Sequence, residues 1–154
     1  MPIGVNFLID LFNHIIYMSI MKPLTIALWV LRLLAAVILL QTLFFKFSAS
    51  EESVYIFSTI GMEPWGRIGT GVMELIAAIL ILIPRTTAFG ALLAIGLMSG
   101  ALFFHLTKLG IEIKGDGGLL FIYSLLVFIS SAILLFVYQS QIRVLLSSVL
   151  PKKS

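Results

Sequence analysis

The sequence predicts an all-α membrane protein: a bundle of four transmembrane helices, preceded by an amphipathic helix at the membrane surface. Two observations carry this prediction. The chain of 154 residues is 60% hydrophobic and only 11% charged, whereas soluble domains carry about 25% charged residues. It also contains separate apolar windows long enough to cross about 30 Å of hydrocarbon. Because lipid offers the backbone no hydrogen-bond partners, windows of this length indicate helices.

The elements follow in chain order. Residues 1–21 place polar side chains at helical spacing beside apolar ones, and they lack the basic region and small-residue cleavage site of a signal peptide. They are predicted to form an amphipathic helix on the membrane surface, with a poorly ordered tail as the alternative. The four-helix domain is predicted at residues 22–140 and a basic tail at 141–154. The predicted spans are Pro23–Phe45, Pro64–Ile83, Thr87–Leu106 and Gly118–Tyr138.

Proline and glycine mark the ends of the spans and the contacts between them. Pro84 ends the second span, because proline cannot continue a helix cleanly. In the third span, Gly96 and Gly100 form a small-xxx-small pair, as do Gly90 and Ala94. Such pairs predict close approach of helix backbones in lipid.

Glu74 is the most informative residue, because it interrupts an otherwise apolar second span. A carboxyl group near the bilayer centre costs at least about 2.5–3.5 kcal/mol, so it needs a partner or a function. At about 1.5 Å per residue, Arg32 and Glu74 lie roughly 12 and 13 Å from the same membrane edge. Equal depth predicts an ion pair between the first two spans. Glu74 also shares a ridge with small residues, which predicts that it faces the bundle.

Two further residues extend this pair into a predicted polar column. Lys46 lies on the same helix face as Arg32 but at the rim, and His105 closes the third span. Such a column suits the polar head group of a quinone or a similar amphiphile, while apolar walls accept the tail. A histidine near its mouth would transfer protons at physiological pH. The candidate ligand-binding residues are Arg32, Glu74, Lys46 and His105.

Structural interpretations of the same residues stay open. The pair of Arg32 and Glu74 would also serve to fix helix register, and Arg32 alone would also reach the interface by snorkelling. Lys46 fits an interfacial anchor, and His105 fits a hydrogen-bonded interface residue.

Several site classes are excluded or left without support. The chain has no cysteine, so it has neither disulfides nor thiolate metal sites. The sequence contains no metal-ligand cluster, nucleotide-binding loop or catalytic triad, so no metal and no covalently bound cofactor is predicted and catalytic residues stay unknown. A bis-histidine haem is poorly supported because His14 lies outside the bundle. The net charge of +3 needs no nucleic-acid partner.

An ordered set of short motifs resembles the DoxX family over about residues 31–136. The motifs are Arg32 followed by Lys46, Gly71-Val72-Met73-Glu74-Leu75, Leu82-Ile83-Pro84-Arg85, Gly90-Ala91-Leu92-Leu93-Ala94, Met98-Ser99-Gly100-Ala101 with His105-Leu106, and Gly117-Gly118. The chain departs from the family at Leu43, where a glycine is common, and in its N-terminal extension. The resemblance implies a four-helix protein, usually of the bacterial inner membrane. Some members are subunits of quinone-linked oxidoreductases or partners of soluble redox enzymes, and others act in quinone detoxification or membrane-protein assembly.

The leading hypothesis is therefore a small membrane subunit of a redox system that binds quinone. Its expected partners are membrane lipids, quinone, a soluble redox protein that supplies electrons, and a second copy of the chain in a homo-oligomer. Alternatives are a non-enzymatic scaffold or assembly factor and a small-solute or proton carrier. An even number of spans puts both termini on one side, and the slight excess of Lys and Arg there predicts that this side is cytoplasmic.

Overall fold

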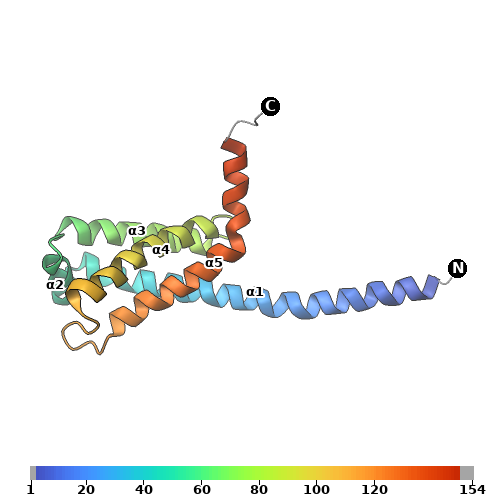
Figure 1. The fold of residues 1–154 in the computed structure, drawn as a ribbon, viewed down its shortest axis with the longest axis horizontal. Helices are drawn as coiled ribbons and strands as arrows, with labels where there is room; N and C mark the ends of the chain where they lie inside the picture. The colour runs from blue at the N-terminus through green and yellow to red at the C-terminus, as the bar shows by residue number, and fades with distance from the viewer. Residues whose placement is uncertain (1–2, 150–154) are drawn as a thin grey trace. The chain divides into compact units, whose positions relative to one another are not determined.

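The computed structural model describes residues 3–149 and confirms the all-helical fold (Figure 1). Over those residues the chain forms five α-helices and one π-helical turn, with no strand. The elements are α1 (Ile3–Phe47), α2 (Glu51–Thr59), α3 (Trp65–Leu82), α4 (Thr87–Phe104), η1 (His105–Leu109) and α5 (Leu119–Val149).

Four stretches of the described helices are long and apolar enough to cross a membrane, and they match the predicted spans closely. Their bounds are Met21–Phe47, Trp65–Leu82, Thr87–Leu109 and Leu119–Val144. The chain is therefore a small multi-pass membrane protein.

The chain divides into two compact units, one ending at Val30 and the other beginning at Leu31. The first unit contains the N-terminal part of α1, which is helical from Ile3 and includes Pro23. The location of this helix on a membrane surface stays a prediction, as do the domain limits 1–21, 22–140 and 141–154. Lys152 and Lys153 of the predicted basic tail lie outside the described residues.

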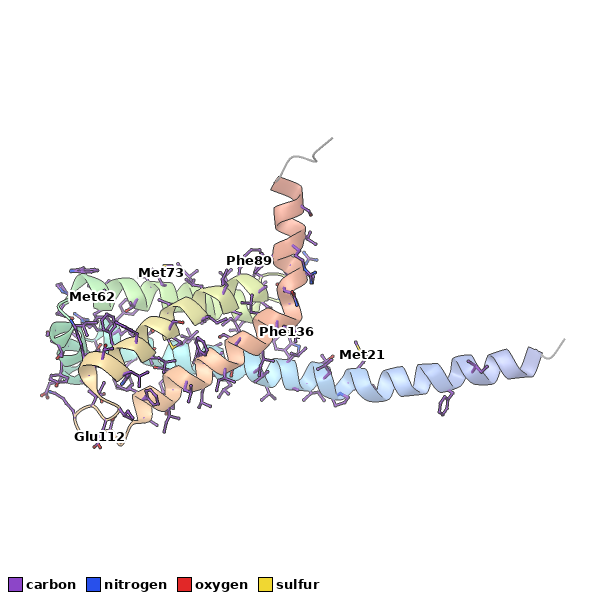
Figure 2. All side chains as sticks on the ribbon, in the orientation of Figure 1. Met21, Met62, Met73, Phe89, Glu112 and Phe136 are labelled. Atoms are coloured by element: carbon purple, nitrogen blue, oxygen red, sulfur yellow. The ribbon has the colours of Figure 1, made fainter. Side chains whose placement is uncertain are left out.

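The second unit is the helical bundle. Figure 1 shows α3, α4, α5 and the C-terminal part of α1 running alongside one another, with α2 at one end. Figure 2 places Met62 and Glu112 at this end, which we call the α2 end, while Phe89 and Phe136 lie toward the other. We call the other end the Pro84 end, after the turn between α3 and α4.

The bundle core includes several fully buried alanines beside larger apolar side chains such as Leu39 and Ile81. Ala35, Ala77 and Ala94 are fully buried, and small residues let helices approach closely in lipid. At Gly90 an added Cβ would lie 2.6 Å from the backbone nitrogen of Ile81, so α4 and α3 are in backbone contact there. This confirms the close approach predicted for that part of the third span.

The same prediction is wrong for Gly96 and Gly100. An added Cβ at either residue would meet no atom within 4 Å. Within the described bundle these glycines therefore leave space instead of bringing two helices together, because no described helix packs against them.

Local capping explains the remaining boundaries. Helix α2 was not predicted. At its start, the Ser50 side chain accepts a hydrogen bond from the Ser53 backbone N–H. Two glutamates occupy the first turn of α2, where their charge complements the helix dipole. α3 ends before Pro84 as predicted. Gln141 of α5 closes the Pro84 end by donating to the Pro84 carbonyl and accepting from the Ala88 N–H, at 2.7 and 2.9 Å.

Candidate functional site

The bundle contains a cavity of about 430 Å³ toward its α2 end. Its walls come from α1, α2, α3, α4 and α5, all within the second unit, and they are largely apolar. Three of the four predicted site residues line it: Lys46, Glu74 and His105. Other polar lining residues include Thr42, Thr70 and Tyr123.

Glu74 forms a buried ion pair on one wall of this cavity. The Lys46 ammonium donates to Glu74 Oε2 at 2.7 Å, and the Thr42 hydroxyl donates to the same oxygen at 2.9 Å. The two charged side chains are only 14% and 6% exposed. No hydrogen bond to Glu74 Oε1 is found among the described residues, so this oxygen is available to a molecule in the cavity.

The C-terminal end of α1 is fixed by a neighbouring charge. Arg67 of α3 binds the Glu63 carboxylate through Nε and Nη2, at 2.7–3.0 Å, and also donates from Nη1 to the Lys46 carbonyl. That carbonyl lies in the last turn of α1, where its other backbone donor is the Ala49 N–H at 3.4 Å. Gly71 of α3 contacts Phe47 closely. Together these contacts set the position of Lys46 relative to Glu74.

His105 lies on another part of the cavity lining, at the start of the π-helical turn. The residue is 5% exposed, and its ring packs edge-on against Phe121 of α5. Its Nδ1 lies 2.8 Å from the Gly110 carbonyl oxygen. Because a carbonyl only accepts, Nδ1 carries the proton and Nε2 is an acceptor in the neutral ring. Nε2 has no hydrogen-bond partner within the described part of the chain.

Arg32 is not part of this cavity, and the predicted ion pair between Arg32 and Glu74 is wrong. The Arg32 side chain is 2% exposed, and its guanidinium lies 4.6 Å from the centre of the Tyr138 ring. Tyr138 lies one turn before Gln141, so this contact is at the Pro84 end. Thr42, which contacts Glu74, follows Arg32 by ten residues, or about 15 Å of helix. The prediction failed because it assumed that the first apolar window begins at the depth where the second one ends.

Asp116 organises the loop that covers the α2 end. Its carboxylate accepts from the backbone N–H groups of Ile113, Gly118 and Leu120 at 2.8–3.1 Å, which caps α5. Partial burial by itself would raise the pKa of Asp116, but these hydrogen bonds, aided by the nearby charge of protonated His105, lower it. Asp116 also lines the cavity.

Three contributors to the site were missed from the sequence: Thr42, Arg67 and Asp116. Thr42 had a usable signal, since it lies one helical turn before Lys46 on the same face. Arg67 lies inside the predicted second span and in α3, but no sequence pattern indicated its contact with the end of α1. The capping role of Asp116 depends on backbone groups that a residue pattern does not reveal. Among the described residues, no three His, Cys, Asp or Glu side chains group closely enough to hold a metal ion.

Comparison with known families identifies the bundle. The sequence model of the DoxX-like family matches residues 30–114, which is more than half of the chain. The chain belongs to the DoxX-like family. The matched region includes Lys46, Glu74 and His105 of this DoxX-like protein and ends before α5. Neither the curated proteins nor the solved structures contain a significant match to it.

Proposed function

We propose that this DoxX-like protein is a membrane subunit of a redox system and binds a quinone, or a similar amphiphile, in the cavity. The observation that supports this proposal is the meeting of Lys46, Glu74 and His105 around one largely apolar space. Ligand sites combine apolar walls with a few convergent polar groups and typically enclose about 300–1,000 Å³. The cavity of about 430 Å³ falls within this range.

Each polar group has a distinct role toward a quinone ring. The Lys46 ammonium donates a hydrogen bond to a carbonyl oxygen, and Glu74 Oε1 accepts one from the hydroxyl of the reduced form. His105 Nε2 accepts a hydrogen bond from the second hydroxyl of the reduced quinone and exchanges a proton with it. Reduction of a quinone to a quinol takes up two electrons and two protons. In this proposal a soluble partner protein supplies the electrons, and the cavity residues handle the protons.

Arg32 has a structural role in this proposal. Because it lies against Tyr138 at the Pro84 end, it fixes α1 against α5 without contacting the ligand. The proposed location is a bacterial inner membrane with both termini in the cytoplasm, as the family resemblance and the distribution of basic residues favour.

The competing scaffold hypothesis assigns the charged loops at the α2 end to a partner protein. Two of those charges are already engaged within the chain. Lys114 donates to Glu51 at 2.6 Å and also lies 5.2 Å from the centre of the Tyr55 ring. The ligand hypothesis is therefore the better supported of the two, because the cavity groups have unused hydrogen-bonding capacity.

The test measures the lipid-soluble molecules retained by gently purified protein, using mass spectrometry. We expect the native chain to retain quinone, and Glu74→Gln and Lys46→Met to lose it. Glu112→Gln is the matched control, because Glu112 is an exposed acid that does not line the cavity. Equal retention by all four proteins would place the ligand elsewhere, and absence of any quinone from native protein reconstituted with it would reject the proposal.

A further inference from the structure

Where α4 borders the cavity, two of its lining residues are glycines and carry no side chain. The residues Leu92, Gly96, Gly100 and Phe104 follow one another at intervals of four, so they form a single ridge on the helix surface. The ridge begins with Leu92, which is exposed, and ends with Phe104, which lines the cavity. The two glycines between them also line the cavity.

The glycines form a notch in this ridge. An added Cβ at Gly96 or Gly100 would meet no atom within 4 Å, and Gly96 is itself exposed. Since successive i+4 residues rotate by about 40° around the helix, the notch lies between the lipid-facing side of α4 and its cavity-facing side. At the two glycines, no side chain of this ridge separates the two sides.

The other exposed residues of the lining carry full side chains. They are Gln41 and Phe45 on α1 and Leu119 on α5. Within the described lining, the glycines are thus where the barrier between lipid and cavity is lowest.

An independent observation, on His105, favours a ligand site behind the notch. His105 is 5% exposed, lines the same cavity and has no hydrogen-bond partner for Nε2 among the described residues. A hydrogen-bonding side chain of a largely buried residue that lines a cavity normally binds water or a ligand.

We infer that the notch at Gly96 and Gly100 is a lateral portal through which the apolar tail of the ligand extends into the bilayer. This inference rests on the proposed function and assigns the substrate class of that site: a long-tailed amphiphile that enters from the lipid phase with its head group toward Lys46, Glu74 and His105. The portal then determines specificity, because it accommodates a tail only while both positions lack side chains.

The experiment compares two ligands in full-length protein reconstituted into nanodiscs. One is a substituted benzoquinone without a tail, and the other is the same ring with a long isoprenoid tail. Binding of each tritiated quinone is measured for the native chain, Gly96→Leu, Gly100→Leu and Glu74→Gln. The matched control is Gly69→Leu on α3, because Gly69 is also exposed with no atom within 4 Å of an added Cβ but does not line the cavity.

We expect Gly96→Leu and Gly100→Leu to weaken binding of the tailed quinone by about tenfold or more, because losing the burial of about two methylene groups accounts for that factor. Binding of the tail-less ring should stay within about twofold of the native value, and Gly69→Leu should bind both ligands normally. Gly96→Ala and Gly100→Ala, which add one methyl group into open space, should give smaller losses and unchanged thermal stability.

Three results would overturn the inference. If the leucine variants bind the tailed quinone normally while Glu74→Gln loses both ligands, the portal is wrong and the proposed function stands. If the leucine variants lose both ligands equally, the glycines border the head-group site instead of a tail passage. If the native chain binds neither quinone, the portal and the proposed function both fail.

Discussion

The ion pair between Lys46 and Glu74 should contribute strongly to the stability of the bundle. Glu74→Gln keeps the side-chain shape but removes the charge that neutralises the Lys46 ammonium, whose side chain is 14% exposed. Breaking a buried pair by removing one partner costs about 3–5 kcal/mol. A cavity of about 430 Å³ adjoins the pair and has room for water that screens the remaining charge. We therefore expect a loss near the lower limit, about 3 kcal/mol.

The double variant Lys46→Met with Glu74→Gln, measured beside the two single variants, isolates the interaction between the two charges. Because both charges are removed, we expect its stability to lie within about 1 kcal/mol of the native chain. With about 3 kcal/mol lost by Glu74→Gln alone, the coupling free energy is then at least about 2 kcal/mol. Thr42 tolerates the change, because the Leu39 carbonyl, 2.9 Å from its hydroxyl oxygen, is an alternative acceptor for its one proton.

The assay is unfolding by sodium dodecyl sulfate in mixed micelles, followed by far-ultraviolet circular dichroism. Glu51→Gln is the control, because it breaks the exposed pair with Lys114 and should cause no measurable loss. A coupling free energy below about 0.5 kcal/mol between Lys46 and Glu74 would refute the reasoning, since independent sites add within that margin.

Three other variants test separate parts of the structure. Gly90→Ala should destabilise the chain by about 1–3 kcal/mol in the same unfolding assay, because its Cβ would overlap the α3 backbone; an unchanged midpoint would contradict the close contact. Arg32→Met should lower stability by about 0.5–2 kcal/mol through loss of the Tyr138 contact. Quinone binding should be retained. A folded variant that no longer binds quinone would show that Arg32 belongs to the ligand site. Asp116 has a lowered pKa in the folded chain, so its contribution to stability is present above the unfolded value of about 3.9 and is lost as pH falls through the folded value. Asp116→Asn should flatten this acid dependence in a pH series of unfolding curves, and an unchanged slope would show that another group is responsible.

The sequence was sufficient to predict the spans and the inward orientation of Glu74. Both follow from one-dimensional properties, the length of apolar windows and the cost of a charge in lipid. The ends of α3 were also predictable, because Pro84 stops a helix wherever it occurs.

The relative depth of the helices could not be predicted from the same information. The apolar part of α1 is 27 residues long and that of α3 is 18, so the shorter helix has several positions along the longer one. The loop containing α2 and the contact of Arg67 with the Lys46 carbonyl fix one of them. That choice pairs Glu74 with Lys46 and leaves Arg32 at the Pro84 end.

The role of each glycine in helix packing could not be predicted from the sequence for a related reason. A missing side chain permits either close helix contact or an open gap, and the residue pattern is the same in both cases. Gly90 shows the first outcome and Gly96 the second, because only Gly90 faces a neighbouring helix.

The π-helical turn η1 has a consequence for how the family tolerates changes in chain length. Such a turn contains one residue more than the α-helical geometry needs. Deleting Thr107 or Lys108 would let the segment continue as a regular α-helix, with Gly110 four instead of five positions after His105. The Gly110 carbonyl would then leave His105 Nδ1, which it now contacts at 2.8 Å. In homologues one residue shorter at this point, a different acceptor must orient the imidazole, or the histidine must be replaced together with the deletion.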